Sequence, residues 1–233
     1  MTGDNIRGMA GTLVPMSPER AGTHAEPRQD RDWWLGPLLA LRNPTAAFAT
    51  LRDDSVEAAE RRQEPLVAIV FLAGVAAMLS TTVAGRLLDA DEFDGILVAV
   101  WAVFFGAVYG LVVYFAFGAL VYASVYAAGS ALSYRQARHL VAFSAVPIVL
   151  SLLLWPARIA LYGGDVFRRG GSDAGAGDAV FDVAFAGCLA WSVALLAVGI
   201  RVLNGWTWSR TLAAVALPAA VPVLALLRAY GVI

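Results

Sequence analysis

The chain has 233 residues, of which 59% are hydrophobic and only 15% are charged, and its formal net charge is −1. Soluble domains are about 45–50% apolar and about 25% charged. This composition excludes a soluble enzyme and a disordered protein, and the near-neutral charge gives nucleic acid no electrostatic reason to bind. All 17 basic residues are arginine, which indicates a GC-rich, prokaryotic genome. The single cysteine, Cys188, excludes an intrachain disulfide and a metal site of several thiolates.

The polar front of the chain divides into two parts. Residues 1–31 carry scattered charges and no periodic apolar pattern, so we expect a disordered cytoplasmic tail. Residues 32–64 begin with a short apolar stretch containing Trp33 and Trp34, which is too short to span a bilayer and suits the headgroup level. The pair Asn43-Pro44 then predicts the start of a helix that runs to about Arg62. We interpret 32–64 as an amphipathic segment at the membrane interface.

Long uncharged intervals fill the rest of the chain, and they predict an all-α, polytopic transmembrane bundle over residues 65–233. The 40-residue interval from 95 to 134 is long enough for two short helices or one long helix. Its centre contains no proline, asparagine or charge that would end a helix, which favours one helix and five spans over a six-span alternative. The expected spans are about 65–85, 95–131, 139–161, 180–202 and 210–230.

The arginines predict the orientation of these spans in the cell membrane. Both the five-span and the six-span arrangement place twelve arginines on the side of the amino terminus and five on the other side. Because cytoplasmic flanks carry the excess of arginine, we expect a cytoplasmic amino terminus and an external loop at residues 86–94.

Glycines spaced by four and eight residues mark the long second span. Gly106, Gly110 and Gly118 lie on a slanting ridge where a second helix can approach closely. Two interpretations stay open for this helix-packing row: a dimerisation surface between two copies, or packing inside the bundle of one copy.

Two charges at the ends of neighbouring spans are candidates for an ion pair at the membrane boundary. Arg158 ends the third span and Asp182 begins the fourth, and both are expected near the outer boundary. A charge at membrane depth is costly unless it is paired, so we predict that the two side chains pair. The alternative is that each one reaches water independently.

The order of several weak motifs resembles the Yip (Ypt-interacting protein) domain family. They are Asn43-Pro44 with Phe48, residues 129–138 followed by 142–147, and residues 191–199 followed by 205–210. The resemblance covers roughly residues 38–230 and implies a five-span integral membrane protein with a cytoplasmic amino terminus. Eukaryotic members are linked to Rab-type GTPases and vesicle traffic. That role is not carried over to this chain, because its tail is short and its expected prokaryotic source lacks that vesicle system.

No motif for chemistry accompanies the spans: we find no metal-ligand spacing, nucleophile elbow or carboxylate dyad. We therefore expect a non-enzymatic scaffold or organiser without a cofactor or a small-molecule substrate. Its expected partners are the lipid bilayer and either a second copy or another membrane protein. The alternative is a small transporter or channel component that uses spans kinked at Pro147, Pro156, Pro218 and Pro222.

Overall fold

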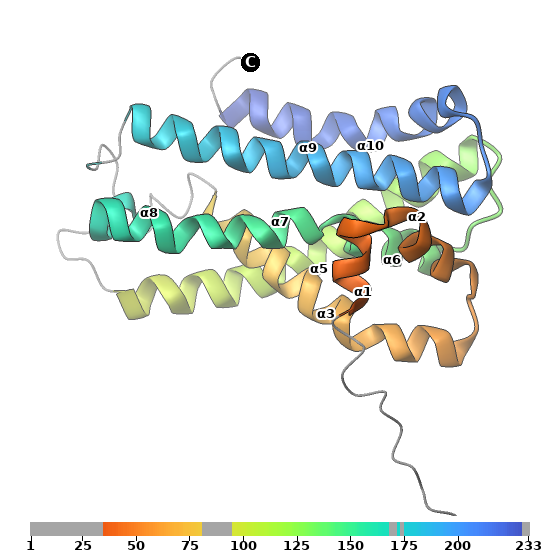
Figure 1. The fold of residues 1–233 in the computed structure, drawn as a ribbon, viewed down its shortest axis with the longest axis horizontal. Coiled ribbons are helices and arrows are strands. Elements are labelled where there is room, and N and C mark those ends of the chain that lie inside the picture. The colour runs from red at the N-terminus through yellow and green to blue at the C-terminus, as the bar shows by residue number, and fades with distance from the viewer. Residues whose placement is uncertain (1–34, 81–94, 168–171, 173–174, 230–233) are drawn as a thin grey trace, which may run out of the picture.

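The computed structural model describes residues 35–80, 95–167, 172 and 175–229, and all of its regular elements in these ranges are helices (Figure 1). The expected tail at 1–31, the tryptophan pair and the expected external loop at 86–94 lie outside the described residues. The elements, in chain order, are α1 (Leu35–Arg42), α2 (Pro44–Ala49), η2 (Thr50–Arg52), α3 (Val56–Leu79), α5 (Gly95–Ala127), α6 (Tyr134–Ser144), α7 (Val146–Leu150), η3 (Ser151–Leu153), α8 (Leu154–Tyr162), η4 (Gly163–Phe167), α9 (Ala176–Asn204) and α10 (Trp208–Ala229).

The segment before the first long helix consists of short helices. Asn43 caps α2, because its side chain accepts a hydrogen bond from the amide of Ala46 at 3.1 Å, and Pro44 occupies the first helical position as predicted. The prediction of one helix continuing to Arg62 is wrong. The backbone becomes extended at Asp53 (φ −77°, ψ 102°), and a new helix begins at Val56.

The first long helix, α3, therefore starts about two turns earlier than the span predicted from 65 to 85. Ser55 caps it by accepting a hydrogen bond from the amide of Ala58 at 3.3 Å. The helix then continues through Pro65, which lies inside it and is buried. Sequence reasoning placed the boundary at Pro65 because the charges end there, but the local capping by Ser55 determines where the helix begins.

The 40-residue interval forms one continuous helix. The helix α5 runs from Gly95 to Ala127, 33 residues, which is about 50 Å at 1.5 Å per residue. This confirms the prediction of a single helix, and the six-span alternative would have needed a break within it. A hydrocarbon core is about 30 Å thick, so α5 extends beyond it at one end or tilts strongly.

The third long segment is helical but interrupted. Helix α6 ends at Ser144, and the amide of Ala145 bonds to the carbonyls of both Val141 (3.1 Å) and Ala142 (3.0 Å). Pro147 has no amide hydrogen to donate, and in a continuous helix its ring would collide with the carbonyl of the preceding turn. These two properties explain why α6 ends and a new helix, α7, begins here. The segment from Tyr134 to Phe167 remains apolar enough to cross a membrane as a unit.

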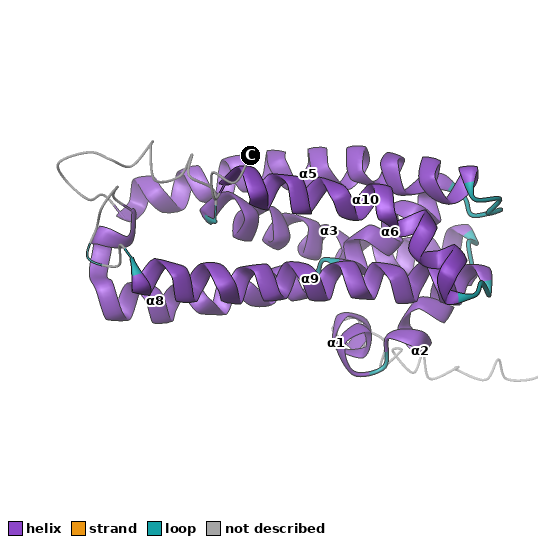
Figure 2. Cartoon of the chain, turned by 90° about the horizontal axis from the view of Figure 1, so that it is seen from above, coloured by secondary structure: helices purple, strands orange, loops and turns teal. Residues whose placement is uncertain are grey.

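The long helices alternate in direction, as the expected five-span order requires (Figure 1). We call one end of the bundle the polar end: α3, α6 and α10 begin there, and α5 and α9 end there. Figure 2 shows α1 and α2 on the outside of the bundle at this end, and α2 packs against α9. The turn from α9 to α10 uses Gly205 in the left-handed conformation (φ 66°).

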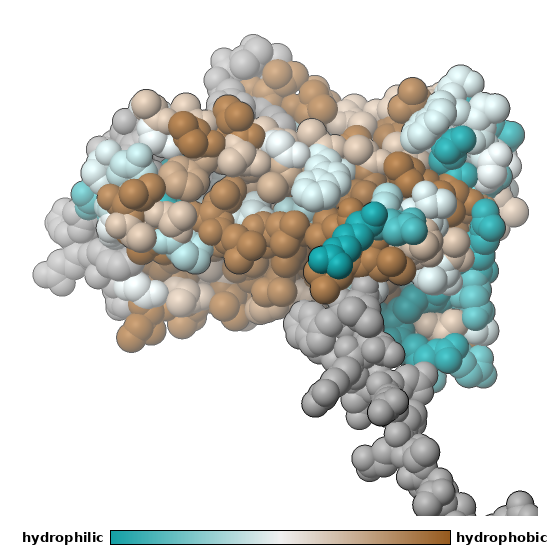
Figure 3. Space-filling view, in the orientation of Figure 1, coloured by the Kyte–Doolittle hydropathy of each residue, from teal (hydrophilic) through white to brown (hydrophobic). Residues whose placement is uncertain are grey.

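Length and composition identify four described helical segments that are able to cross a membrane: Val56–Leu79, Gly95–Ala127, Tyr134–Phe167 and Ala176–Asn204. A shorter apolar helix, Trp208–Leu224, accompanies them. Figure 3 shows hydrophobic residues over most of the visible side of the bundle, and hydrophilic residues gathered at the polar end. Exposed apolar side chains such as Ile96 and Val183 require a nonpolar surrounding. The chain is therefore an all-α, multi-pass membrane protein.

Candidate functional site

The break between η2 and α3 brings a carboxylate to the start of α6. The carboxylate of Asp54 accepts hydrogen bonds from the Nε of Arg135 at 2.7 Å and from the hydroxyl of Ser133 at 2.8 Å. A second nitrogen of Arg135 also donates to the backbone carbonyl of Asp54. Ser133 is the N-cap residue of α6. We call Asp54, Ser133 and Arg135 the polar junction; it joins the residues before α3 to the start of α6, about 80 positions later in the sequence.

Further bonds from side chains to carbonyls hold the residues before Asp54 in place. The amide of Gln136 donates to the carbonyl of Leu51 at 3.0 Å, and Arg52 donates to the carbonyl of Val202 in α9 at 2.6 Å. Arg62 in α3 donates to the carbonyls of Thr50 and Asp53, both at 2.6 Å. The N-terminal segment (residues 35–55) is thus bonded to α3, α6 and α9.

The carboxylates of Asp53 and Asp54, between η2 and α3, are both held in the charged form. Hydrogen bonds donated by the hydroxyl and amide of Ser55 lower the pKa of Asp53. At Asp54, partial burial favours the neutral form, but the hydrogen bonds from Arg135 and Ser133 outweigh it, so the pKa of Asp54 also lies below its usual value.

An aromatic side chain anchors the same segment in the apolar core. Phe48 is fully buried, and it lies against Gly199 of α9. A Cβ added at Gly199 would lie only 3.1 Å from the ring of Phe48, and it would also collide with Leu140 of α6. The small residue therefore leaves room for the ring, and the N-terminal segment packs as part of the core.

The helix-packing glycines of α5 lie against other helices of the same chain. A Cβ at Gly106 would lie 2.7 Å from the Cα of Val75 in α3, and a Cβ at Gly110 would lie 3.2 Å from the Cα of Gly74. Gly118 lies against α6, where an added Cβ would be 3.3 Å from the Cα of Arg138. The structure therefore places the row inside one bundle, and Gly74 is a partner that sequence reasoning did not name.

The opposite end of the bundle brings the end of the third segment close to the start of α9. Arg158 of α8 forms an ion pair with Asp178 at 2.5 Å, and its guanidinium carbon lies 5.3 Å from the ring centres of both Trp155 and Phe181. Asp182, the predicted partner, lies one turn further along α9 than Asp178. The Arg158–Asp182 pair stays a prediction.

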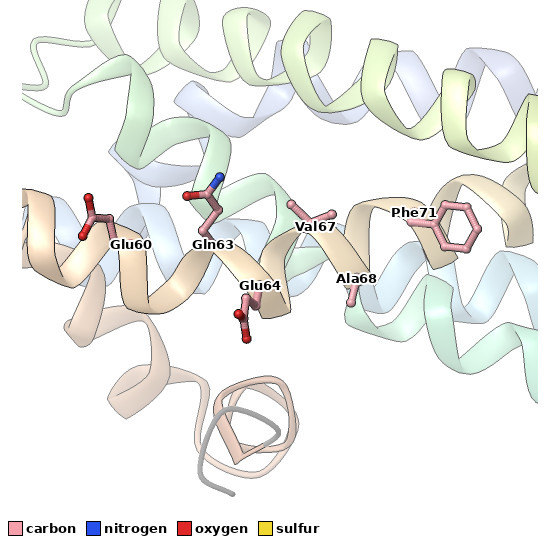
Figure 4. A pocket seen from close by; sticks show the side chains of 6 residues that line it. All are labelled: Glu60, Gln63, Glu64, Val67, Ala68 and Phe71. Carbon is pink, nitrogen blue, oxygen red and sulfur yellow. The ribbon is translucent and has the colours of Figure 1, made fainter. Parts of the chain in front are cut away.

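The outward side of α3 combines carboxylates with apolar side chains. Figure 4 shows six side chains that follow one another along this helix and line a shallow concavity on it, which we call the α3 face: Glu60, Gln63, Glu64, Val67, Ala68 and Phe71. Glu60 and Glu64 form no ion pair with any basic side chain in the described part of the chain. Val67 is 61% exposed.

A comparison with protein-family models matches the Yip1 domain over residues 27–229. The match covers most of the chain, including every helix described above. The chain belongs to the Yip1 domain family. No curated protein and no solved structure matches this Yip1-domain chain. The family resemblance found from the sequence is thereby confirmed.

Sequence reasoning missed two parts of this Yip1-domain protein, the polar junction at Asp54 and the α3 face. It assigned no role to Asp54 and no partner to Arg135, although the capping signature Ser133 to Gln136 marked the start of α6 and thus the place where a distant polar group could dock. It also missed the α3 face, for which the signal was available. Glu60 and Glu64 lie one turn apart directly before an apolar run, and they fall on the same side of a helix as Val67 and Phe71.

Proposed function

We propose that this Yip1-domain protein is a non-enzymatic scaffold of the cell membrane, whose α3 face binds the membrane-spanning helix of a partner protein with basic residues at its cytoplasmic end. One observation carries the proposal: on the α3 face, two carboxylates with no basic partner among the described residues continue directly into the exposed Val67 and the half-buried Phe71.

The carboxylates of Glu60 and Glu64 do little for the fold. Like charges four residues apart destabilise a helix by about 0.2–0.5 kcal/mol. Neither residue lies in the first turn of α3, where the helix dipole would favour a negative charge. Anionic lipids on the cytoplasmic surface also repel them. A basic partner therefore removes an unfavourable arrangement.

The apolar part of the α3 face fits a helix that lies parallel to it in the bilayer. Val67 and Phe71 follow Glu64 at helical spacing, and the small side chain of Ala68 between them allows close approach. Membrane-spanning helices commonly carry arginine or lysine at their cytoplasmic ends. A partner helix of this kind reaches Glu60 and Glu64 with its basic end while its apolar part packs on Val67 and Phe71.

The N-terminal segment fixes the orientation of the α3 face. Arg62 lies between the two carboxylates in the sequence, and it is bonded to the carbonyls of Thr50 and Asp53. Asp54 is in turn bonded to Arg135. Because the start of α3 is bonded to the segment that docks on α6 and α9, the helix backbone that carries the carboxylates is held in place, which reduces the entropy lost on binding.

The distribution of arginine supports a cytoplasmic location for the polar end and the amino terminus. Arg158 and Arg228 lie toward the opposite end of the bundle. Most other arginines of the described part lie near the helix ends that form the polar end, namely Arg61, Arg62, Arg135, Arg138, Arg201 and Arg210, and Arg52 is bonded there to the carbonyl of Val202. An excess of arginine on one side of a membrane protein favours the cytoplasm for that side.

The transporter alternative gains no specific support from the kinked segments. The buried hydroxyls of Ser144, Ser151 and Thr211 donate to the carbonyls of Leu140, Ile148 and Thr207, which lie three or four residues earlier in the chain. These bonds satisfy local backbone groups at the kinks and helix starts.

Quantitative co-purification from the native membrane tests the scaffold proposal. A tagged wild-type chain and three double variants are purified after mild crosslinking: Glu60→Asp with Glu64→Asp, Glu60→Gln with Glu64→Gln, and Glu60→Arg with Glu64→Arg. We expect a membrane protein with basic cytoplasmic residues to follow the wild type and the Asp variant. The Arg variant should lose it by more than about tenfold, because two partly exposed ion pairs each contribute up to about 1 kcal/mol.

A charge exchange provides the decisive control. Reversing the basic residues of the recovered partner should restore its binding to the Glu60→Arg, Glu64→Arg variant. Equal recovery by all variants, or recovery of only a second copy of this chain, would contradict the proposal.

A further inference from the structure

A partly enclosed cavity lies between the N-terminal segment and the long helices at the polar end. Its volume is about 180 Å³, and α1, α2, α3 and α6 all contribute to its lining. Its lining includes Leu39, Ala47, Arg61, Arg62, Pro65 and Phe143. Two guanidinium groups therefore meet an otherwise largely apolar wall.

The two arginines differ in how the protein holds them. Arg62 is fixed, because two of its nitrogens donate to the carbonyls of Thr50 and Asp53, whereas its buried Nε has no acceptor in the structure. Arg61 is exposed and forms neither an ion pair nor a hydrogen bond within the described residues. The nearby carboxylate of Asp53 balances one of the two positive charges and bonds to the amide of Ser55.

The cavity lies where the polar end gives way to the apolar part of the bundle. Arg61 and Arg62 come four and three residues, respectively, before Pro65, where the uncharged run of α3 begins. Phe143 lies in the last turn of α6. In membrane proteins, the change from charged to apolar residues marks the headgroup level, where lipids have their phosphate groups and from which their acyl chains extend toward the bilayer centre.

We propose that this cavity binds the phosphate group of an anionic glycerophospholipid. The free guanidinium of Arg61 binds a phosphate oxygen, and the fixed guanidinium of Arg62 supplies a second positive charge. Leu39, Pro65 and Phe143 contact the glycerol and the first methylene groups. Binding sites for whole drug-sized molecules measure about 300–1,000 Å³. The smaller cavity therefore holds the headgroup region, while the acyl chains lie outside it along the bundle.

The apolar walls favour a lipid over free phosphate. A soluble anion would have to lose water at Leu39 and Phe143 without a compensating apolar contact. A lipid covers the same walls with hydrocarbon. The proposal does not depend on the scaffold function, because it uses the side of α3 that faces the N-terminal segment and requires no partner protein.

Native mass spectrometry of the full chain tests the site. The protein is exchanged from nanodiscs containing equal amounts of phosphatidylglycerol and phosphatidylcholine, and the lipids that it retains are counted. We expect one retained phosphatidylglycerol in the wild type. Arg61→Gln should reduce its retention about fivefold, which corresponds to the attraction of one arginine for an anionic lipid surface. Leu39→Trp, which narrows the cavity without changing charge, should reduce retention as well.

Matched controls separate this site from general attraction to lipid. Arg42→Gln removes an exposed arginine at the end of α1 that does not line the cavity, and it should leave retention unchanged. Equal retention by the wild type and Arg61→Gln would overturn the proposal. It would also be overturned if inorganic phosphate displaced the lipid at millimolar concentration. The proposal would also be overturned if phosphatidylglycerol were retained only after residues 1–34 are deleted. That result would mean that the tail, and not a lipid, occupies the cavity of the full chain.

Discussion

The carboxylate of Asp54, at the end of the N-terminal segment, lies 2.7 Å from the Nε of Arg135 in the first turn of α6. This contact joins the segment that precedes the first span to the start of the third. The hydroxyl of Ser133 binds the other oxygen of the same carboxylate. One side chain of the N-terminal segment therefore accepts bonds from both the cap and the first turn of a membrane helix.

We predict that Asp54→Asn and Arg135→Gln are not additive. Both side chains are partly exposed, so the coupling in a double-mutant cycle should be favourable but small. Denaturation of the purified protein by a mixture of detergents measures it. Asp53→Asn is the matched control, because the carboxylate of Asp53 bonds to the neighbouring amide of Ser55 and not to α6. Strict additivity would show that the contact is absent in solution.

The same carboxylate predicts how stability depends on pH. The pKa of Asp54 is lower in the folded protein than in the unfolded chain, so folding favours the charged form. Its contribution to stability is complete above about pH 4 and is lost as the pH falls through the folded-state pKa. The midpoint of thermal unfolding should thus fall less steeply below about pH 4 in Asp54→Asn than in the wild type. Identical slopes would contradict this assignment.

The close approach of α3 and α5 predicts a large effect of side chains at the glycine row. Gly110→Leu should destabilise the protein by about 1–3 kcal/mol or more, because the added atoms meet the backbone of α3. Gly187→Leu is the control, since nothing lies within 4 Å of a Cβ at that position. Unfolding in detergent and the mass of the protein in detergent are measured together. A change of oligomeric state without a loss of stability would favour the dimer interpretation instead.

Two double-mutant cycles decide which carboxylate Arg158 depends on. The ion pair in the structure predicts that Arg158→Ala and Asp178→Ala together cost less than the sum of the two single changes. The sequence predicts that Arg158→Ala and Asp182→Ala together cost less stability than either change alone. Asp178 is half exposed, so we expect a coupling below about 1 kcal/mol. If neither cycle shows coupling and all single changes are harmless, each side chain reaches water independently.

The sequence was sufficient for the features that depend on hydrophobic runs and local caps. The absence of breakers between 95 and 134 correctly predicted α5 as one helix, and Asn43-Pro44 correctly predicted the start of α2. The end of that helix was missed, because Ser55 is a weak signal on its own. Charged residues on both sides of it made the stretch from 43 to 62 resemble a single surface helix.

Contacts between distant residues were beyond sequence reasoning. The glycine row predicted that some helix would approach α5, but the choice between α3 and a second copy depends on the arrangement of the whole bundle. The bond between Asp54 and Arg135 likewise arises only after α6 folds back beside α3. A single sequence gives no pairing information for charges that are about 80 residues apart.

Site-specific photo-crosslinking in the native membrane tests the scaffold account most directly. A photoreactive amino acid is placed at Val67 on the α3 face, and in a second protein at Val183, an equally apolar and exposed position on α9. The account predicts an adduct with a partner protein at Val67 that Glu60→Arg with Glu64→Arg abolishes, and no such adduct at Val183. Adducts with lipid alone at both positions, or a protein adduct that does not respond to the charge reversal, would contradict it.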